Sequence, residues 1–416
     1  MKKIFFSLAV SLITILSADD GETAYMGRDS QMNQECPQKS CEPCCPKPTP
    51  PICCECYVPS YYDLQCNTGL FIYGDFLYWY AKEDNLSPCT TVQAVTNVVT
   101  STTPTVVLAN VKVNHLNTQW DPGFRVGLGY NLPHDGWDIE ANYTWYHNKK
   151  SHVFSVPGFG STTSNVFPTP GQLALIDPWV NTSVLSPSGT FVEVFPFDTV
   201  QSRWKLSFNQ IDLDLGRKFW LSKYTAMRTY VGVRGGWFTT RFNNKGSANY
   251  NFASTFTFTN FSDQFKTKTW GVGLLAGIQP EWHFSRNFIL FSNLDAALLW
   301  GRFNLRKTED YTSFSASGVQ SINFHASFPS VFYKMHPVLD IALGLRWEET
   351  WCYRIRTYLD IGWENHIWFD ENHRFKYGSF FTNTISPGNA IGYSGYEELQ
   401  GNLMMGGGFV RFRVDF

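Results

Sequence analysis

The sequence predicts an all-β fold: a transmembrane, antiparallel, up-and-down β-barrel with ten strands. Three observations support this prediction. Apolar and polar side chains alternate along many segments, long and short connections alternate between these segments, and the chain begins with an export signal. A period of two residues is that of a strand whose two faces meet different surroundings.

The first 18 residues have the order of a secretory signal peptide. Lys2 and Lys3 precede an apolar run from Ile4 to Leu16, and Ala18 follows shortly after it. This order is typical of an export signal, and the run is shorter than the roughly 20 residues of a spanning helix. We therefore expect cleavage after Ala18 and an exported mature chain.

Composition narrows the class of protein. Aromatic residues make up 17% of the chain and charged residues only 16%, below the roughly 25% charged residues that are usual in soluble domains. The formal net charge is -2, so nucleic acid is not an expected partner.

Residues 19–68 are interpreted as a separate periplasmic segment rich in cysteine and proline. Prolines at this density exclude a regular helix or central strand. Thiols of an exported protein are expected to oxidise, and the disulfide candidates are Cys36, Cys41, Cys44, Cys45, Cys53, Cys54, Cys56 and Cys66. Bridges within the chain and cross-links to other envelope proteins are both open.

A metal site is the rival interpretation of these thiols. It would use Cys41, Cys44, Cys54 and Cys56, but their spacing is loose and no histidine lies nearby. We expect neither a metal nor another cofactor.

The barrel is expected to occupy residues 69–416. The alternation is clearest in 136–147, where apolar positions such as Ile139 and Tyr143 alternate with Asp138, Glu140 and other polar residues. A clean apolar face suits lipid, because a charge at the bilayer midplane costs about 2–4 kcal/mol. The ten expected strands are 69–81, 120–130, 136–147, 204–220, 225–240, 268–282, 286–301, 335–349, 352–368 and 402–416.

The connections alternate in length. The long ones are expected at 82–119, 148–203, 241–267, 302–334 and 369–401, with short turns between them. Long outer loops and short periplasmic turns are typical of outer-membrane barrels, and an even number of strands places both termini in the periplasm. Strand-like stretches at 105–113, 190–194, 250–258 and 321–328 leave twelve to sixteen strands open.

The last strand has two chemically opposite faces. Met404, Val410, Phe412, Val414 and Phe416 share the apolar face, and Arg411, Arg413 and Asp415 share the charged one. Because no strand follows it, we expect it to pair with the first strand and to close the barrel.

Aromatic residues near strand ends predict two girdles at the lipid headgroups. These residues are Tyr78, Trp120, Trp137, Trp145, Trp220, Tyr224, Trp282, Trp300, Trp351 and Trp368. Two strands fit less well. The first has aromatic residues on both faces, and the apolar parity slips between Phe208 and Ile211, which predicts a bulge or a later strand start.

Charged residues on the inward faces are the candidate pore lining. Acidic candidates are Asp138, Glu140, Asp212, Asp214 and Asp360, and basic candidates are Arg354, Arg356, Arg411 and Arg413. We expect opposite walls of unlike charge, which create a transverse field that tunes selectivity. In the alternative, Arg228, Lys218 and Asp360 neutralise these groups in a packed core without an open lumen.

The sequence does not favour catalysis. Its nine histidines are scattered without the spacing of a zinc pair or an obvious triad. His336 and His366 are interpreted as polar lumen residues. We therefore do not expect an enzyme.

Several segments resemble the chlamydial-type major outer membrane protein-like (MOMP-like) pore-forming family. They are Leu70 to Leu86 (LFIYGDFLYWYAKEDNL), Asp121 to Tyr130 (DPGFRVGLGY), Leu213 to Gly216 (LDLG) and the terminal Phe416. The resemblance covers about 69–416. It implies an outer-membrane porin whose Phe416 signals to the barrel-assembly machinery, and it favours disulfide links to cysteine-rich envelope proteins.

The function expected from these features is passive diffusion of small hydrophilic solutes or ions. The alternative is a closed-barrel adhesin or structural surface protein that acts through outer loops, including 161–165 and 250–260. Such loops could instead fold inward as a plug. Outer-membrane lipid is an expected partner, and a homo-oligomer is open.

Overall fold

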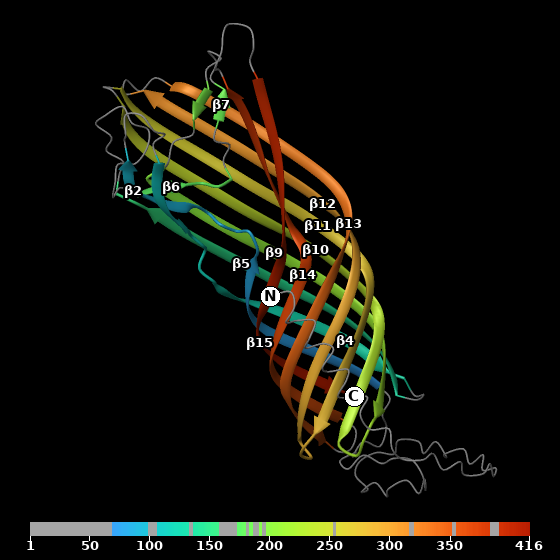
Figure 1. Cartoon of the computed structure of the whole chain (residues 1–416). Coiled ribbons are helices and arrows are strands. Elements are labelled where there is room, and N and C mark those ends of the chain that lie inside the picture. Colours follow the sequence, from blue (N-terminus) through green and yellow to red (C-terminus); the bar gives the residue numbers. More distant parts are fainter. Residues whose placement is uncertain are drawn as a thin grey trace, which may run out of the picture. The chain divides into compact units, whose positions relative to one another are not determined.

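Ten long strands form an antiparallel ring (Figure 1). The computed structural model describes residues 69–98, 106–132, 136–157, 173–179, 183–185, 191–193, 197–252, 255–315, 320–351, 355–382 and 391–416. The ring strands are β1 (Gly69–Glu83), β4 (Trp120–Asn131), β5 (Trp137–Ser155), β9 (Thr199–Trp220), β10 (Thr225–Phe252), β11 (Thr255–His283), β12 (Phe288–Ser315), β13 (Gln320–Trp351), β14 (Ile355–Thr382) and β15 (Ile391–Asp415).

The first and last strands close the ring, as predicted. β1 pairs with β15 from Phe71 opposite Asp415 to Glu83 opposite Leu403. On its other side β1 pairs with β4. No edge is left along β1, which removes the unpaired N–H and C=O groups that a membrane cannot satisfy.

Farther from the short turns the wall divides between β13 and β14. Their pairing stops at Val338 opposite Trp368, and the β14 register with β15 shifts between Trp368 and Asn372. Asp370, within this shift, has a positive φ of 53°. Beyond it β14 continues with β15, while β13 continues with β12.

The prediction of long loops is wrong for several connections, because the strands continue through them. Only residues 253–254 separate β10 from β11, and only 316–319 separate β12 from β13. The stretches 250–258 and 321–328 therefore lengthen the ring strands instead of adding new ones. Their composition supports strands, so the hydrogen-bonded ladder extends past the apolar belt.

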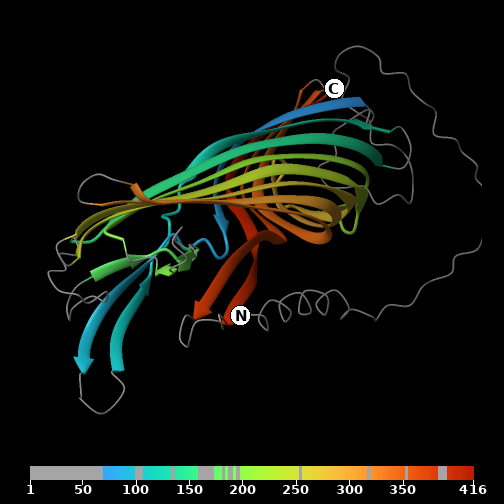
Figure 2. The same ribbon diagram turned by 90° about the horizontal axis from the view of Figure 1, so that it is seen from above.

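Two small sheets account for the remaining strands. β2 (Thr90–Val98), β3 (Val106–Val113) and β6 (Leu173–Ile176) form one, and β7 (Ser183–Leu185) pairs with β8 (Phe191–Glu193) in the other. The β2–β3 hairpin extends away from the ring (Figure 2). The stretches 105–113 and 190–194 thus form strands, but outside the ring.

The prediction of a bulge or a later strand start in 204–220 is wrong. β9 keeps one register with β5 and β10, and every second side chain from Val200 to Asp214 is buried. Phe208 points inward and Ile211 outward. The apolar parity changes because the interior itself becomes apolar in this part of the ring.

Large apolar side chains cover the outside of the ring. Leu274 is 75% exposed and Val231 is 62% exposed. Outward aromatic residues stack across strands, as in Tyr78 with Trp120 (5.7 Å between ring centroids) and Trp300 with Tyr333 (5.2 Å). Such a belt between aromatic girdles matches a bilayer.

Two residues expected in the girdles point inward instead. Trp368 is fully buried, and Trp220 lines an interior cavity. Each has the inward parity of its strand. Within the described residues, no helix has the length and apolar character needed to cross a membrane.

Candidate functional site

A polar cavity of about 720 Å³ occupies the barrel interior next to the short turns. All ten ring strands contribute inward side chains to it. Within the described chain, its lining includes ten carboxylates and eight arginine or lysine side chains. Inward polar residues are sheltered from lipid, so the period-two pattern that makes the outer belt also builds this cavity.

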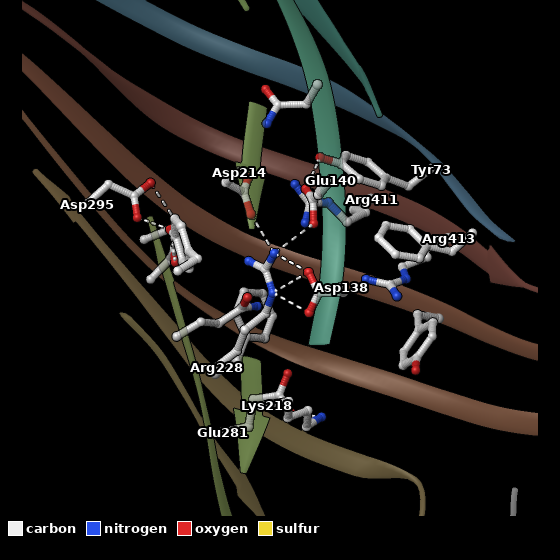
Figure 3. A pocket seen from close by; sticks show the side chains of 18 of the residues that line it. Tyr73, Asp138, Glu140, Asp214, Lys218, Arg228, Glu281, Asp295, Arg411 and Arg413 are labelled. Atoms are coloured by element: carbon white, nitrogen blue, oxygen red, sulfur yellow. Dashed lines mark hydrogen bonds and ion pairs between the residues drawn. The ribbon is translucent and has the colours of Figure 1, made fainter. Parts of the chain in front are cut away.

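Arg228 of β10 is the centre of one charge cluster (Figure 3). Its guanidinium donates to Asp138 of β5 and, at 2.5 Å, to Asp214 of β9, and Glu140 lies 3.8 Å away. The Tyr73 hydroxyl of β1 donates to Glu140 Oε1 at 2.5 Å. Asp138, Glu140 and Asp214 converge closely enough to ligate a cation. Arg228 supplies positive charge at that point.

Arg234 holds a second cluster deeper in the barrel. Its Nε donates to Asp212 Oδ1 at 2.8 Å, and its Nη1 donates to Asp340. Asp295 lies 3.9 Å from Arg234 Nη2, and His366 Nδ1 is 2.8 Å from Asp340. The cluster joins strands on different sides of the ring. It therefore narrows the polar lumen.

Two further clusters complete the polar wall. Arg125 bridges Asp75, at 3.0 Å, and Glu364, at 3.2 Å. Asp75 also accepts from Arg411 at 2.8 Å. Near the short turns, Glu281 accepts from Lys218 and Arg346, and Asp360 accepts from Arg346; Arg413 pairs with Asp415.

The charge arrangement differs from the predicted transverse field. Asp138, Glu140 and Asp214 are neutralised by Arg228, Asp212 by Arg234, and the basic candidates Arg411 and Arg413 by Asp75 and Asp415. Arg356 lines the cavity near Tyr358, and Arg354 lies outside the described residues. Opposite charges are thus adjacent, since neighbouring strands supply both signs at similar heights.

Sequence reasoning missed several charged lining residues. They are Arg125, Arg234, Glu281, Asp295, Asp340, Arg346, Glu348 and Glu364. The alternation along each strand predicts that these residues point inward. Arg125 stands between the outward Phe124 and Val126, and Glu364 follows the outward Trp363.

An aromatic layer covers the end of the cavity farther from the short turns. It contains Trp79, Tyr146, Phe208, Phe238 and Trp368, which are all buried. Trp368 contacts Phe208 and Phe238, with 5.4 Å between ring centroids in each case, and Trp79 contacts Tyr146 at 5.3 Å. These rings belong to one apolar cluster that spans the interior. The polar lumen is therefore interrupted here.

A segment of the long β5–β9 connection packs above this layer. We call residues 173–179 the inner segment. Trp179 is 3% exposed, belongs to the same apolar cluster, and contacts Phe265 of β11. Its Nε1 donates to the carbonyl of Ser87 at 2.7 Å. The inner segment thus lies inside the extended part of the ring.

Asp177 fixes the inner segment through a buried carboxylate. It accepts from the Trp179 backbone N–H at 2.8 Å and from Asn244 Nδ2 of β10 at 2.9 Å. Burial raises the pKa of the Asp177 carboxyl to about 7. A group with that pKa changes charge in the physiological range.

The disulfide candidates Cys36 to Cys66 lie outside the described residues, as do the expected signal peptide and Cys352. Cys89, in the β1–β2 connection, is a buried free thiol. Burial raises the pKa of this thiol to about 11, so it is a poor nucleophile at neutral pH. Phe416 is 56% exposed, and its backbone N–H donates to Leu70 O at 2.9 Å.

The ring, its apolar belt and its charged interior define an integral outer-membrane β-barrel. The sequence matches the family described as "Legionella pneumophila major outer membrane protein precursor" over residues 66–416. The chain therefore belongs to this outer-membrane protein family. The expected resemblance is confirmed as membership of a major outer membrane protein family, and the family that matches is that of Legionella.

Membrane barrels of known structure show only distant similarity to this chain. The outer membrane protease OmpT from Escherichia coli is 9% identical, with 86% of this chain and 99% of that chain covered and a TM-score of 0.29. The toluene transporter TodX from Pseudomonas putida is 7% identical, with 84% and 90% covered and a TM-score of 0.21. The monoaromatic hydrocarbon channel CymD is 8% identical, with 85% and 90% covered and a TM-score of 0.22. Comparison with curated proteins gives no match.

Proposed function

We propose that this protein is an outer-membrane pore for small hydrophilic solutes or ions, with its long connections outside the cell and its short turns in the periplasm. The observation that carries the proposal is the charged cavity in the barrel interior. Charged walls inside an apolar exterior suit hydrated solutes. No catalysis is part of this function.

In this proposal the aromatic layer closes the pore. Trp79 and Trp368 come from opposite flanks of β15, and both point into the interior. Transport requires these rings and the inner segment to move aside. In this proposal the polar cavity is the periplasmic vestibule of a pore in its closed state.

Planar-bilayer recordings test the closure. The double variant Trp79→Ala and Trp368→Ala removes two rings of the aromatic layer and is expected to raise conductance per inserted molecule severalfold. The matched control is Tyr78→Ala and Trp363→Ala, which removes two outward rings from the same strands. The control is expected to keep wild-type conductance. Absence of current steps in every variant and salt would refute the pore.

A closed surface protein is the second candidate, because the aromatic layer and inner segment pack the interior. Val156 N–H donates to Asp198 O at 2.9 Å, so the two ends of the β5–β9 connection are adjacent. Residues 158–196 can therefore be replaced by a short glycine-serine linker. Raised conductance supports the plug, whereas lost surface binding with unchanged conductance supports the adhesin.

The remaining partners are proposals of the same kind. Phe416 is the signal for the barrel-assembly machinery, and the thiols between Cys36 and Cys66 link the barrel to other cysteine-rich envelope proteins. Non-reducing gels of native envelopes test the second point. Reductant-sensitive bands larger than the monomer are expected, and a variant with these eight cysteines changed to serine is expected to lose them.

A further inference from the structure

Five basic side chains form a continuous row on the outside of the ring. We call Lys149, Lys205, Arg241, Lys266 and Arg306 the basic row. They lie on β5, β9, β10, β11 and β12, and each stands directly opposite the next across a strand pair. All five have outward parity and are exposed or half-buried.

More positive charge surrounds the basic row. Arg203 and Lys268 lie two residues from Lys205 and Lys266 on the same outward faces. The row ends at β13, where Pro329 stands opposite Arg306. The positive surface is therefore confined to one side of the barrel.

Within the described residues, no acidic side chain pairs with the side chains of the basic row; the neighbouring Asp121 carboxylate accepts from the Lys149 backbone N–H at 3.0 Å. Like charges placed directly opposite each other destabilise a strand pair. The nearby carboxylates Asp263 and Glu309 have inward parity and are buried. Within the described part of the chain, no ion pair joins a basic-row side chain to a carboxylate. An anion from outside the chain would compensate this repulsion.

The position of the row identifies the source of that anion. Trp145, Asn209, Trp237 and Trp270 form a parallel row on β5, β9, β10 and β11. The basic row lies four residues farther from the short turns, or roughly 13 Å along each strand. Outward tryptophans mark the headgroup level of a bilayer. The basic row therefore meets the zone where lipid phosphates lie.

We propose that the basic row binds the phosphate groups of an anionic, phosphorylated glycolipid of the outer leaflet. Five strands span roughly 19 Å, since neighbouring strands lie about 4.8 Å apart, which is room for more than one phosphate. Arg241 and Arg306 supply planar forks for bidentate contacts with phosphate. This site does not depend on the pore function and is separate from the interior cavity.

Binding to the full chain in neutral detergent tests the proposal. The probe is a bisphosphorylated glucosamine-disaccharide lipid, with its dephosphorylated form and inorganic phosphate as separate arms. The test variant combines Lys205→Gln, Arg241→Gln and Lys266→Gln. The control combines Lys82→Gln, Lys112→Gln and Lys223→Gln, which removes the same charge from three exposed positions outside the row.

The bisphosphorylated lipid is expected to bind and to raise the unfolding temperature of the wild type and the control. The row variant should bind it at least about tenfold more weakly, since each basic side chain contributes to attraction for anionic headgroups. Without lipid, the row variant should unfold no earlier than the wild type, because repulsion is relieved. Equal binding by both variants, or by the dephosphorylated lipid, overturns the proposal. If inorganic phosphate raises the unfolding temperature as much as the lipid does, the proposal is overturned in favour of a soluble anion. If the row variant loses self-association, the proposal is overturned in favour of a second copy of this chain.

Discussion

The Lys307 ammonium group of β12 donates a hydrogen bond to the backbone carbonyl of Trp179, at 2.6 Å, inside the barrel. This contact joins the wall to the inner segment. Lys307 is fully buried and also pairs with Glu309. A buried ammonium group bonded to a carbonyl is stable only while that carbonyl stays in place. The wall therefore holds the inner segment directly.

The substitution Lys307→Met is expected to loosen the inner segment. Methionine keeps much of the side-chain volume beside Phe265 but loses the hydrogen bond, which costs on the order of 2 kcal/mol for a charged donor. Proteolysis within 173–179 should become faster and conductance should rise. Thr308→Met, at the next and outward position of β12, is the control. If both variants are cleaved at the wild-type rate, Lys307 does not hold the segment.

The pH dependence of the inner segment follows from Asp177. The pKa of the Asp177 carboxyl is about 7 while the inner segment is docked, that is, packed inside the barrel, because burial disfavours the charged form. It is roughly 4 when the segment is released and the carboxyl is in water. The docked state therefore binds the proton more tightly. Docking is fully stable below about pH 4, weakens as the pH rises towards 7, and changes little above that.

Conductance and protease access at pH 5 and pH 8 should reveal this dependence. Both are expected to be higher at pH 8 in the wild type. Asp177→Asn keeps one acceptor oxygen, for the Trp179 backbone N–H, loses the acceptor for Asn244 Nδ2, and cannot ionise, so its pH response should be flat. A variant that still opens at high pH would show that Asp177 is not the titrating group and would direct attention to the buried Asp263, which faces the same region.

Removing the Arg228 guanidinium should destabilise the barrel. Arg228→Met leaves Asp138, Glu140 and Asp214 without their shared cation, and breaking such a buried pair costs on the order of 3 kcal/mol. Arg228→Lys keeps one positive charge and should lose less. Millimolar Ca²⁺ should partly restore the unfolding temperature of the methionine variant, because three carboxylates then converge on an empty position. Restoration of the lysine variant to the same degree would contradict this account.

The sequence supported the prediction of ten strands and their closure because lipid makes a strict demand on one face. A charged outward residue is costly, so positions such as Val272 and Leu274 remain apolar and mark each strand. Strand ends beyond the bilayer lack this constraint. There, β10 and β11 continue through residues with mixed composition, and their extent depends on pairing that the pattern does not show.

The interior was harder to predict, because the pattern gives the direction of a side chain but not its height or partner. The alternation predicts that Asp138 and Asp214 point inward, yet their neutralisation by Arg228 depends on the register between β5, β9 and β10. The sequence places Trp368 in the girdle because it lies near an expected strand end. Its strand continues to Thr382, and its parity directs the ring inward.

Gly127 leaves room for the inward ring of Tyr73. These residues are directly opposite in the β1–β4 pair, and a Cβ at Gly127 would lie 2.2 Å from the Tyr73 ring, whose hydroxyl donates to Glu140. Gly127→Ala must displace that ring, so we expect a loss of about 1–3 kcal/mol of stability, measured by urea unfolding in detergent. Gly74→Ala, on β1, is the matched control, since nothing lies within 4 Å of its Cβ position, and its stability should change little. Equal unfolding of the two variants would show that the Tyr73 ring moves at no cost and that its bond to Glu140 does not stabilise the cavity wall.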